Sequence, residues 1–467
     1  MKILKYIGPF LRMNSLTLEN LENQLFFFAK ESLKHIVLKS RCGITQMPKN
    51  FKKIIPNNDI NIIKDFSPLL CIYRKANPKL IKEKDYAYWD NSTFKKEILP
   101  TSCAFMTLSI MELIDYYQQF KDKDNSLYTL SILYKSMAKH QLDFYTSYLR
   151  NPEGVFITKK NVSEDISDDL RFEDKENKYK FSDQAFMMAA FLRYSYIDGT
   201  KDSEAYRSFS KDILRMLIHY RDAIYDLSFE EINRICFALN IAYSYSKDEE
   251  VKYFIMDITD LLVHYYHENS NIKEKIDHSS LFIINLNLSY NICDIEYLKD
   301  MKDDIKNYMF SLYDKEKGIL MKNTTKKEIK YSSEDLIMFM VSALMEEEYE
   351  EELGSLLVEV YKHQIVNSKL ITNWPESPSL DNPERYLGFT LDSEDLMDEQ
   401  NFRLSTLDSP ESNEYAPIFL KSLEYNVKKD IFTPSKTSFD SSKNMNLLFI
   451  IIFILKNSVY KNYNITK

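Results

Sequence analysis

Two acidic clusters in this sequence carry the residue types that acid–base chemistry needs. Ser182-Asp183-Gln184 and Ser332-Ser333-Glu334-Asp335 each stand directly before a run of apolar residues. In a pair of carboxyl groups, a protonated one can donate a proton to a leaving oxygen, and an ionised one can activate water or attack a sugar carbon. Asp183, Glu334 and Asp335 are therefore the candidate catalytic residues.

A structural role competes with the catalytic one at both clusters. Ser, Asp and Glu are favoured in the first turn of a helix, because they accept hydrogen bonds from free backbone N–H groups and suit the helix dipole. Ser228-x-x-Glu231 has the spacing of a capping box, and Ser332-x-x-Asp335 is a close variant of it. Helix capping is a sufficient explanation for these pairs.

Capping explains Asp183 and Glu334 less fully. Ser182 and Ser332 can supply the caps of the two helices, so the caps require no carboxylate at the neighbouring positions. Phenylalanines flank Asp183 on both sides, and apolar surroundings raise the pKa of a carboxyl group. We expect Asp183 to act as a general acid, against the alternative that it only complements the helix dipole.

A second group of residues has the chemistry of saccharide recognition. Aromatic side chains present flat apolar faces to sugar rings, and carboxylates and amides hydrogen-bond to sugar hydroxyl groups. An acidic loop that begins near residue 373 and an aromatic cluster that ends at residue 90 combine these types. The alternative is that the loop is a solvated surface segment. The candidate binding residues are Trp89, Asp90, His278, Trp374, Glu376, Arg385 and Tyr386.

Several classes of function are disfavoured by what the sequence lacks. Seven glycines and the absence of both glycine-rich phosphate motifs predict no nucleotide cofactor. His264-x-x-His267 has no evident third ligand and the five cysteines form no CxxC pair, so we expect no metal site and no disulfide framework. The net charge of −9 provides no basic surface for a nucleic-acid partner.

The sequence contains no segment typical of export or membrane insertion. Residues Met1 to Leu11 lack the apolar core of a secretory signal. The longest apolar run, Leu447 to Leu455, is nine residues long, whereas a bilayer span needs about 20. With scattered cysteines that suit a reducing compartment, these features predict a soluble, cytoplasmic protein.

The elements that position the acidic clusters are predicted to be pairs of helices. The first helix of most pairs is apolar all round and the second is apolar on one side, which predicts an inner ring of buried helices within an outer ring. The expected pairs are 101–121 with 126–150, 182–197 with 203–220, 228–246 with 249–268, 278–293 with 295–312, 333–346 with 349–366, and 411–425 with 441–457.

The amino-terminal segment is expected to contain one further helix over residues 15–40. The last predicted pair departs from the rule because its second helix holds the Leu447–Leu455 run, and the amino-terminal helix could cover that run and close the ring. We therefore divide the chain into a segment at 1–100 that packs on the toroid and a toroid domain at 101–467.

Long connections are expected on one face of the ring. Turns within the pairs are short, whereas the connections at 151–181, 313–332 and 367–410 are long. Pieces centred on Gly154 and Gly318 predict small β-hairpin inserts in two of them. Because the helices alternate in direction, the long connections and the amino-terminal ends of the inner helices should share a face, together with the acidic clusters.

This arrangement of six helical hairpins resembles the six-hairpin (α/α)6 toroid of many glycoside hydrolases and polysaccharide lyases. The resemblance is architectural and covers most of the chain after Pro100. It implies an all-α toroid and a carbohydrate-active protein, hydrolase or lyase, with an acidic, aromatic cleft on the long-loop face and a saccharide ligand. The alternative function is a non-catalytic helical toroid that is a scaffold for a protein partner or a glycan.

Overall fold

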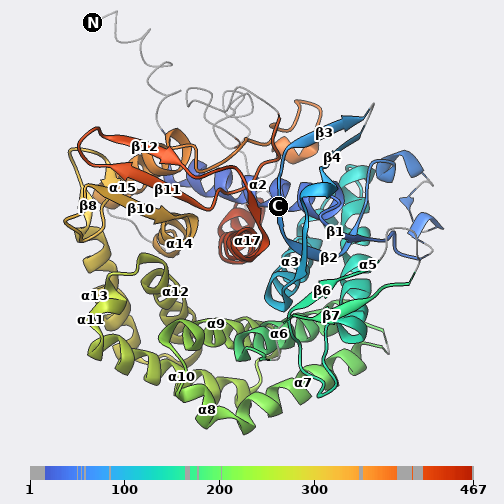
Figure 1. Cartoon of the computed structure of the whole chain (residues 1–467), viewed down its shortest axis with the longest axis horizontal. Coiled ribbons are helices and arrows are strands. Elements are labelled where there is room, and N and C mark those ends of the chain that lie inside the picture. The colour runs from blue at the N-terminus through green and yellow to red at the C-terminus, as the bar shows by residue number, and fades with distance from the viewer. Residues whose placement is uncertain are drawn as a thin grey trace, which may run out of the picture.

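The chain forms a double ring of helices with small antiparallel sheets beside it (Figure 1). The structure is a computed structural model that describes residues 16–464, apart from residues 50, 54, 57–58, 84–85, 164–168, 176–177, 201, 346–350, 387–401 and 403–413. The architecture is the all-α (α/α)6 toroid that the hydrophobic pattern predicts, with β inserts in the long connections.

Within the described residues, six helices form the inner ring. They are α3 (Pro100–Glu112), α6 (Phe181–Asp198), α9 (Phe229–Ser246), α12 (Ile276–Cys293), α14 (Ser333–Ala343) and α17 (Ser441–Asn464). Each helix packs against the next in this order, and α17 packs against α3 to close the ring. These helices are apolar on nearly every side, so burial of all their faces removes the most apolar surface from water.

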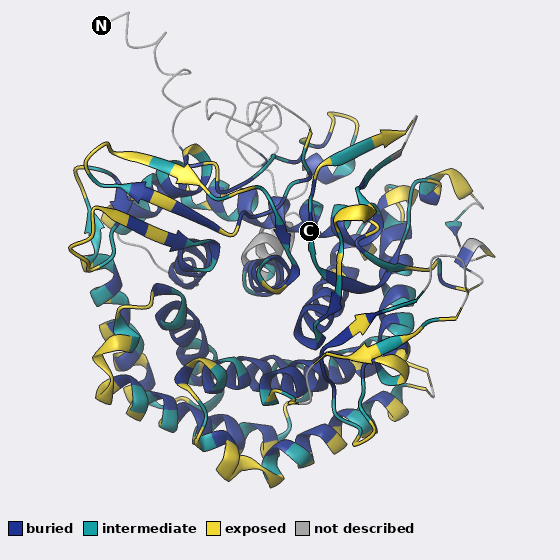
Figure 2. Ribbon diagram, viewed as in Figure 1, coloured by how far each residue is buried: buried dark blue, intermediate teal, exposed yellow. Residues whose placement is uncertain are grey.

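The outer helices pack on the inner ring with one side and face water with the other, as Figure 2 shows. On α7, Tyr206, Ile213 and Leu217 are buried at helical spacing and most of the residues between them are half-buried or exposed. The outer helices are α2 (Leu18–Leu38), α5 (Asn125–Tyr148), α7 (Ser203–His219), α10 (Glu249–Glu268), α13 (Glu296–Ser311) and α15 (Glu351–Val360), which continues as the π-helix η5 (Tyr361–Asn367).

Five of the predicted helix pairs are confirmed, and one helix of the sixth pair is wrong. Residues 411–413 lie outside the described part, and Ser422–Asn426 is strand β11, which pairs with β10 (Glu328–Ser332) and β12 (Ile431–Pro434). Helix α17 packs instead along α2, so the first and last helices of the described residues form the sixth pair. Segment 1–100 thus contributes a ring helix, and the division at residue 100 stays a prediction.

The apolar run Leu447–Leu455 lies inside α17 and is buried except at Ile454, which is half-buried. It packs where α17 meets α2, α3 and α14. Among the helices that the structure describes, none is long and apolar enough to cross a membrane.

The long connections run from the end of an outer helix to the start of an inner one, as predicted. The largest sheet pairs β1 (Gly43–Thr45), β2 (Leu69–Ala76), β5 (Lys95–Ile98), β6 (Lys159–Asn161) and β7 (Phe172–Asp174) in this order, with β13 (Phe439–Asp440) on β2. The hairpin at Gly318 is confirmed as β8 (Tyr313–Asp314) with β9 (Ile319–Leu320), whereas the piece at Gly154 forms one bridge, between Arg150 and Phe156.

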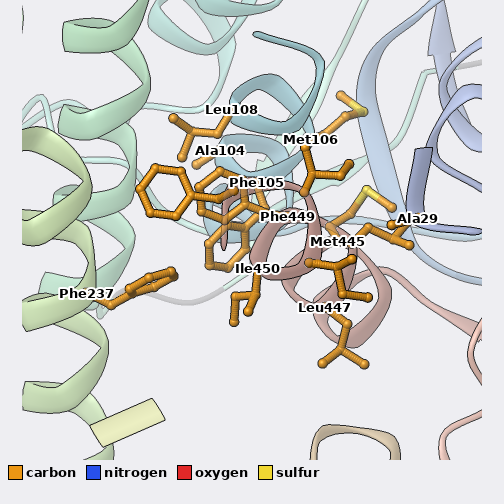
Figure 3. Packing of buried hydrophobic residues seen from close by; sticks show 14 of the residues in the cluster. Ala29, Ala104, Phe105, Met106, Leu108, Phe237, Met445, Leu447, Phe449 and Ile450 are labelled. Atoms are coloured by element: carbon orange, nitrogen blue, oxygen red, sulfur yellow. The ribbon is translucent and has the colours of Figure 1, made fainter. Parts of the chain in front are cut away.

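Aromatic side chains fill the middle of the inner ring. Phe105 lies 4.4 Å from Phe186 and 5.4 Å from Phe449 between ring centroids, and Phe237 lies 6.1 Å from Phe449. Figure 3 shows Phe105 and Phe449 stacked, with Phe237 approaching from the facing helix. The middle of the toroid is therefore a packed core, and the first turns of the inner helices form the layer at one end of it.

Candidate active site at the amino-terminal end of the inner ring

Asp183 lies in the first turn of α6 and only 9% of its surface is exposed. The hydroxyl group of Thr101, in the first turn of α3, donates a hydrogen bond to Asp183 Oδ1. Burial raises the pKa of Asp183, and the Thr101 hydrogen bond and the charges of Arg234 and Lys180 oppose this only in part, while Glu231 adds repulsion. Asp183 therefore binds a proton more readily than an exposed aspartate does.

The start of α6 is capped by the neighbouring helix α9. The N-cap position is Lys180, and the buried hydroxyl of Ser182 has no hydrogen-bond partner in the described part of the chain. Glu231 Oε1 of α9 accepts a hydrogen bond from the Ser182 backbone N–H at 3.0 Å. The prediction that Ser182 caps α6 is therefore wrong. Ser228 does cap α9, but Glu231 reaches across to α6 and leaves the predicted capping box incomplete.

Asp277 and His278 lie in the first turn of α12 and interact with acidic residues on both neighbouring helices. His278 Nε2 lies 3.5 Å from Glu230 Oε2 on α9. The hydrogen bond with His278, aided by its charge, lowers the pKa of Glu230 to about 2 although partial burial acts against it. Burial raises the pKa of Asp277, and repulsion by Asp335 and Glu334 on α14 raises it further, against the attraction of His278.

The two acidic residues of α14 are each bound to a lysine. Ser332 and Asp335 form the predicted capping box: Asp335 N donates to Ser332 Oγ at 3.0 Å, and Ser332 N donates to Asp335 Oδ2 at 2.6 Å. Asp335 Oδ2 also accepts a hydrogen bond from Lys322 Nζ at 2.8 Å. Glu334 forms an ion pair with Lys443, in the first turn of α17. Asp335 thus has a confirmed structural role at the helix start.

Polar side chains from all six inner helices meet around this end of the ring, which we call the acidic ring. A 3.2 Å contact between the hydroxyls of Ser441 and Ser102 joins α17 to α3 at this end. The acidic ring comprises Thr101, Asp183, Glu230, Glu231, Arg234, Asp277, His278, Glu334, Asp335 and Lys443. Helices α6 and α14 are three positions apart in the ring of six, so Asp183 and Glu334 lie on opposite sides of it.

The acidic ring holds carboxyl groups with separated pKa values. Asp183 and Asp277 have raised pKa values, whereas the pKa of Glu230 is about 2. Surroundings that separate the pKa values of nearby carboxyl groups provide a proton donor and a proton acceptor at the same pH. No group of three or more His, Cys, Asp or Glu side chains in the described part of the chain is placed to hold a metal ion.

Trp89 and Asp90 are engaged in local structure. Trp89 is fully buried, its indole N–H donates to His35 Nε2 at 3.0 Å, and its ring packs edge-on against Phe439. Asp90 Oδ1 accepts a hydrogen bond from the Ser92 backbone N–H at 2.9 Å, which caps a short 3-10 helix. These contacts place both residues in the packing of the amino-terminal sheet region.

The predicted binding residues after Asn373 lie along α2, on the outside of the ring. Trp374 donates its indole N–H to Phe402 O at 2.5 Å, and Glu376 is exposed. Arg385 is 4% exposed and donates to Pro378 O at 2.7 Å. The adjacent Glu384 forms an ion pair with the buried Lys30 of α2, which fastens this segment to the outer helix. The side chain of Tyr386 lies outside the described part.

Six residues of the acidic ring were not among the predicted site residues: Thr101, Glu230, Glu231, Arg234, Asp277 and Lys443. Asp277 is detectable in the sequence, because it begins an apolar helix next to His278. Arg234 lies one turn after Glu230 in α9 and its guanidinium lies 5.6 Å from the ring centroid of Phe186. Lys443 lies in the first turn of α17. The sequence pattern assigned this helix to the second position of a pair, so Lys443 was not expected at the start of an inner helix.

The inner and outer rings of alternating helices give the chain the (α/α)6 six-hairpin glycosidase-like fold. Cellobiose 2-epimerase from Bacillus thermoamylovorans B4167 matches 92% of this chain and 98% of its own, with a TM-score of 0.50 at 12% identity. A sugar epimerase from a ruminal bacterium matches 78% of this chain and 88% of its own, with a TM-score of 0.47 at 11% identity. No protein-family model and no curated protein sequence matches the chain.

Proposed function

We propose that the acidic ring is the active site of a carbohydrate-active enzyme that uses carboxyl groups as acid and base. The observation that carries this proposal is that Asp183 and Asp277 have raised pKa values while Glu230, on the helix between theirs, is held ionised. A structural role does not require this separation, and acid–base catalysis does.

Asp183 is the proposed proton donor, because it is buried and its described hydrogen bond comes from a neutral hydroxyl group. Glu334 is the proposed carboxylate partner on the opposite side of the ring, oriented by Lys443. Asp335 positions Glu334 by capping the same helix, and His278 is the proposed contact to sugar hydroxyls. Trp89, Asp90, Trp374, Glu376 and Arg385 are excluded from the proposed site because they lie in packed or outer positions.

Protonation of a glycosidic oxygen and removal of a proton next to a carbonyl group both need a positioned acid and base. Hydrolysis and elimination are the reactions that the toroid resemblance implies, and the similar structure of a cellobiose 2-epimerase adds epimerisation to them. We therefore propose an acid–base reaction on a saccharide, which is hydrolysis, elimination or epimerisation.

The test is turnover of a panel of disaccharides and oligosaccharides by the full chain, followed by proton NMR, which detects cleavage, elimination and epimerisation together. Asp183→Asn is expected to lower turnover at least about 100-fold while the circular dichroism spectrum stays unchanged. Asp300→Asn, at an exposed position on α13, is the matched control and should keep full activity. Full turnover in Asp183→Asn refutes the assignment.

A non-catalytic toroid that binds a glycan or a protein is the second candidate. It is favoured by the ion pairs of Glu334 with Lys443 and of Asp335 with Lys322, which occupy two of the acidic residues. Thermal-shift measurements separate the two functions, because a ligand that binds the native state raises its melting temperature. Binding without turnover across the panel supports the scaffold.

A further inference from the structure

Three cationic side chains converge on one buried carboxylate in the sheet beside α3. Glu97, on β5, is 5% exposed and accepts a hydrogen bond from Arg74 Nη1 of β2 at 2.9 Å. Lys95 Nζ lies 3.2 Å and Lys175 Nζ lies 3.8 Å from Glu97 Oε1. Burial opposes ionisation, but the hydrogen bonds and charges of Arg74 and Lys95 outweigh it and lower the pKa of Glu97. We call these four residues the cation cluster.

The cation cluster carries more positive charge than Glu97 neutralises. Three cations against one carboxylate leave a surplus of two positive charges, in a chain whose net charge is −9. Lys160 and Glu173, the next residues in register on β6 and β7, are of opposite charge and balance each other.

Part of the hydrogen-bonding capacity of the cation cluster is unused. The side chains of Arg74, Lys95 and Lys175 are between 38% and 48% exposed, so a ligand can reach all three from solvent. Arg74 Nε is buried and has no hydrogen-bond partner among the described residues. An anion from solvent would contact the exposed parts of the three cations, not this buried donor.

The cation cluster lies close to the acidic ring. Strand β5 leads directly into α3, and four residues separate Glu97 from Thr101, the hydrogen-bond partner of Asp183. At about 3.6 Å per residue at most, the two sites lie within about 14 Å along the chain. Lys175 precedes Phe181, the first residue of α6, by six residues. Figure 1 shows β2 and β6 beside α3 on this side of the ring.

We propose that Arg74, Lys95 and Lys175 form a subsite for an anionic group of a saccharide, either a carboxylate or a sulfate. The inference rests on the proposed saccharide function. The planar guanidinium of Arg74 matches the oxygen atoms of these groups, and the lysines add charge without fixed geometry. The carboxylates of the acidic ring repel an anionic unit, so the saccharide places a neutral unit at Asp183 and its anionic unit at the cation cluster.

The test measures binding of three oligosaccharides of equal length to the full chain by calorimetry: a neutral gluco-oligosaccharide, an oligogalacturonate and a sulfated galactan fragment. One of the two anionic ligands is expected to bind at least about tenfold more tightly than the neutral one, and to lose affinity as salt rises. Arg74→Gln and Lys175→Gln should each weaken anionic binding about tenfold and leave neutral binding unchanged. Lys211→Gln, exposed on α7, is the control.

Equal affinities for neutral and anionic ligands, or unchanged anionic binding in both variants, overturns the subsite. A single-stranded DNA of equal charge that binds as tightly also overturns it, because the site would then recognise charge alone. Asp183→Asn separates this proposal from the catalytic one. Loss of turnover in Asp183→Asn with no effect of Arg74→Gln on binding refutes the subsite alone, whereas Arg74-dependent binding without any turnover refutes the catalytic assignment alone.

Discussion

Each end of the inner ring buries a carboxyl group. Neighbouring basic residues outweigh the cost of burying its charge at one end, and they fail to do so at the other. At the carboxyl-terminal end, Glu112 of α3 is 1% exposed and is bound by Arg193 Nε at 3.0 Å and by Lys456 and Tyr245. Burial acts to raise the pKa of Glu112, but the charges of Lys456 and Arg193 outweigh it and lower the pKa. At the amino-terminal end, burial prevails and the pKa of Asp183 is raised.

Ionised Glu112 therefore stabilises the fold, whereas ionised Asp183 destabilises it. Glu112 joins α3 to α6, α9 and α17, and each of its contacts stabilises the ionised form. Asp183 has one described hydrogen-bond donor, a neutral hydroxyl group, and its ionised form costs free energy on folding. A buried residue whose ionisation destabilises an otherwise well-packed ring is a candidate functional residue.

The largest expected effect is that of Glu112→Ala. The substitution leaves Arg193 and Lys456 without the buried anion that compensates them, so we expect a loss of about 3–5 kcal/mol in the free energy of unfolding. Denaturant unfolding followed by circular dichroism measures it. Glu274→Ala, at an exposed position, is the control and should change stability by less than about 0.5 kcal/mol. A loss below about 1 kcal/mol would show that the two ends are not different in kind.

Thr101→Val is expected to have the next largest effect. Valine matches the shape of threonine but removes the hydroxyl that donates to Asp183, which leaves a buried carboxyl group without that donor. We expect a loss of about 1–3 kcal/mol at neutral pH and a further rise in the pKa of Asp183. Thr101→Ser restores the hydroxyl and should recover most of the stability. If valine is as stable as serine at this position, the hydrogen bond contributes little.

The double ring was predictable because its signals are local. Apolar residues on every side distinguish an inner helix from a one-sided outer helix within about 15 residues, and five pairs were found in this way. The apolar run at residues 416–420, just before strand β11, is too short to distinguish a helix from a strand. Strand β11 pairs with Glu328–Ser332, which lies about 90 residues earlier, so the sequence pattern contains no signal for the pairing.

The candidate site was predictable only where its contacts are local. The capping box of Ser332 and Asp335 spans three residues and was correctly predicted. The bond between Glu231 and Ser182 spans 49 residues, and the role of Ser182 as a cap was therefore wrong. Flanking phenylalanines indicated a raised pKa for Asp183, but its hydrogen-bond partner is 82 residues away and follows only from the packing of α3 against α6.

Asp183→Asn is expected to stabilise the protein by an amount on the order of 1 kcal/mol at neutral pH. The folded-state pKa of Asp183 lies above its unfolded value, so the cost of ionisation is absent below the unfolded pKa of about 3.9 and grows as pH rises through the folded pKa. Asparagine keeps an oxygen that accepts from Thr101 and carries no charge. Unfolding measured between pH 4 and 8 should show the variant gaining on the wild type as pH rises. A constant difference across this range contradicts the raised pKa.

The smallest expected effect concerns the pair of His278 and Glu230, where the acidic ring contains a compensated carboxylate like that at the opposite end. The pKa of Glu230 is lowered to about 2, so the pair stabilises the fold above the unfolded value of about 4.3 and the contribution is lost as pH falls towards 2. Because Glu230 is 61% exposed, solvent screening limits this contribution to a few tenths of a kcal/mol.

His278→Leu should raise the pKa of Glu230, measured by NMR titration, and reduce the stability lost between pH 4.5 and 2. His264→Leu removes a 3.3 Å pair with Glu268 on α10, where both side chains are at least 60% exposed, and should leave the Glu230 titration unchanged. If both variants leave it unchanged, His278 does not hold Glu230 ionised, and its proposed place in the site then rests on position alone.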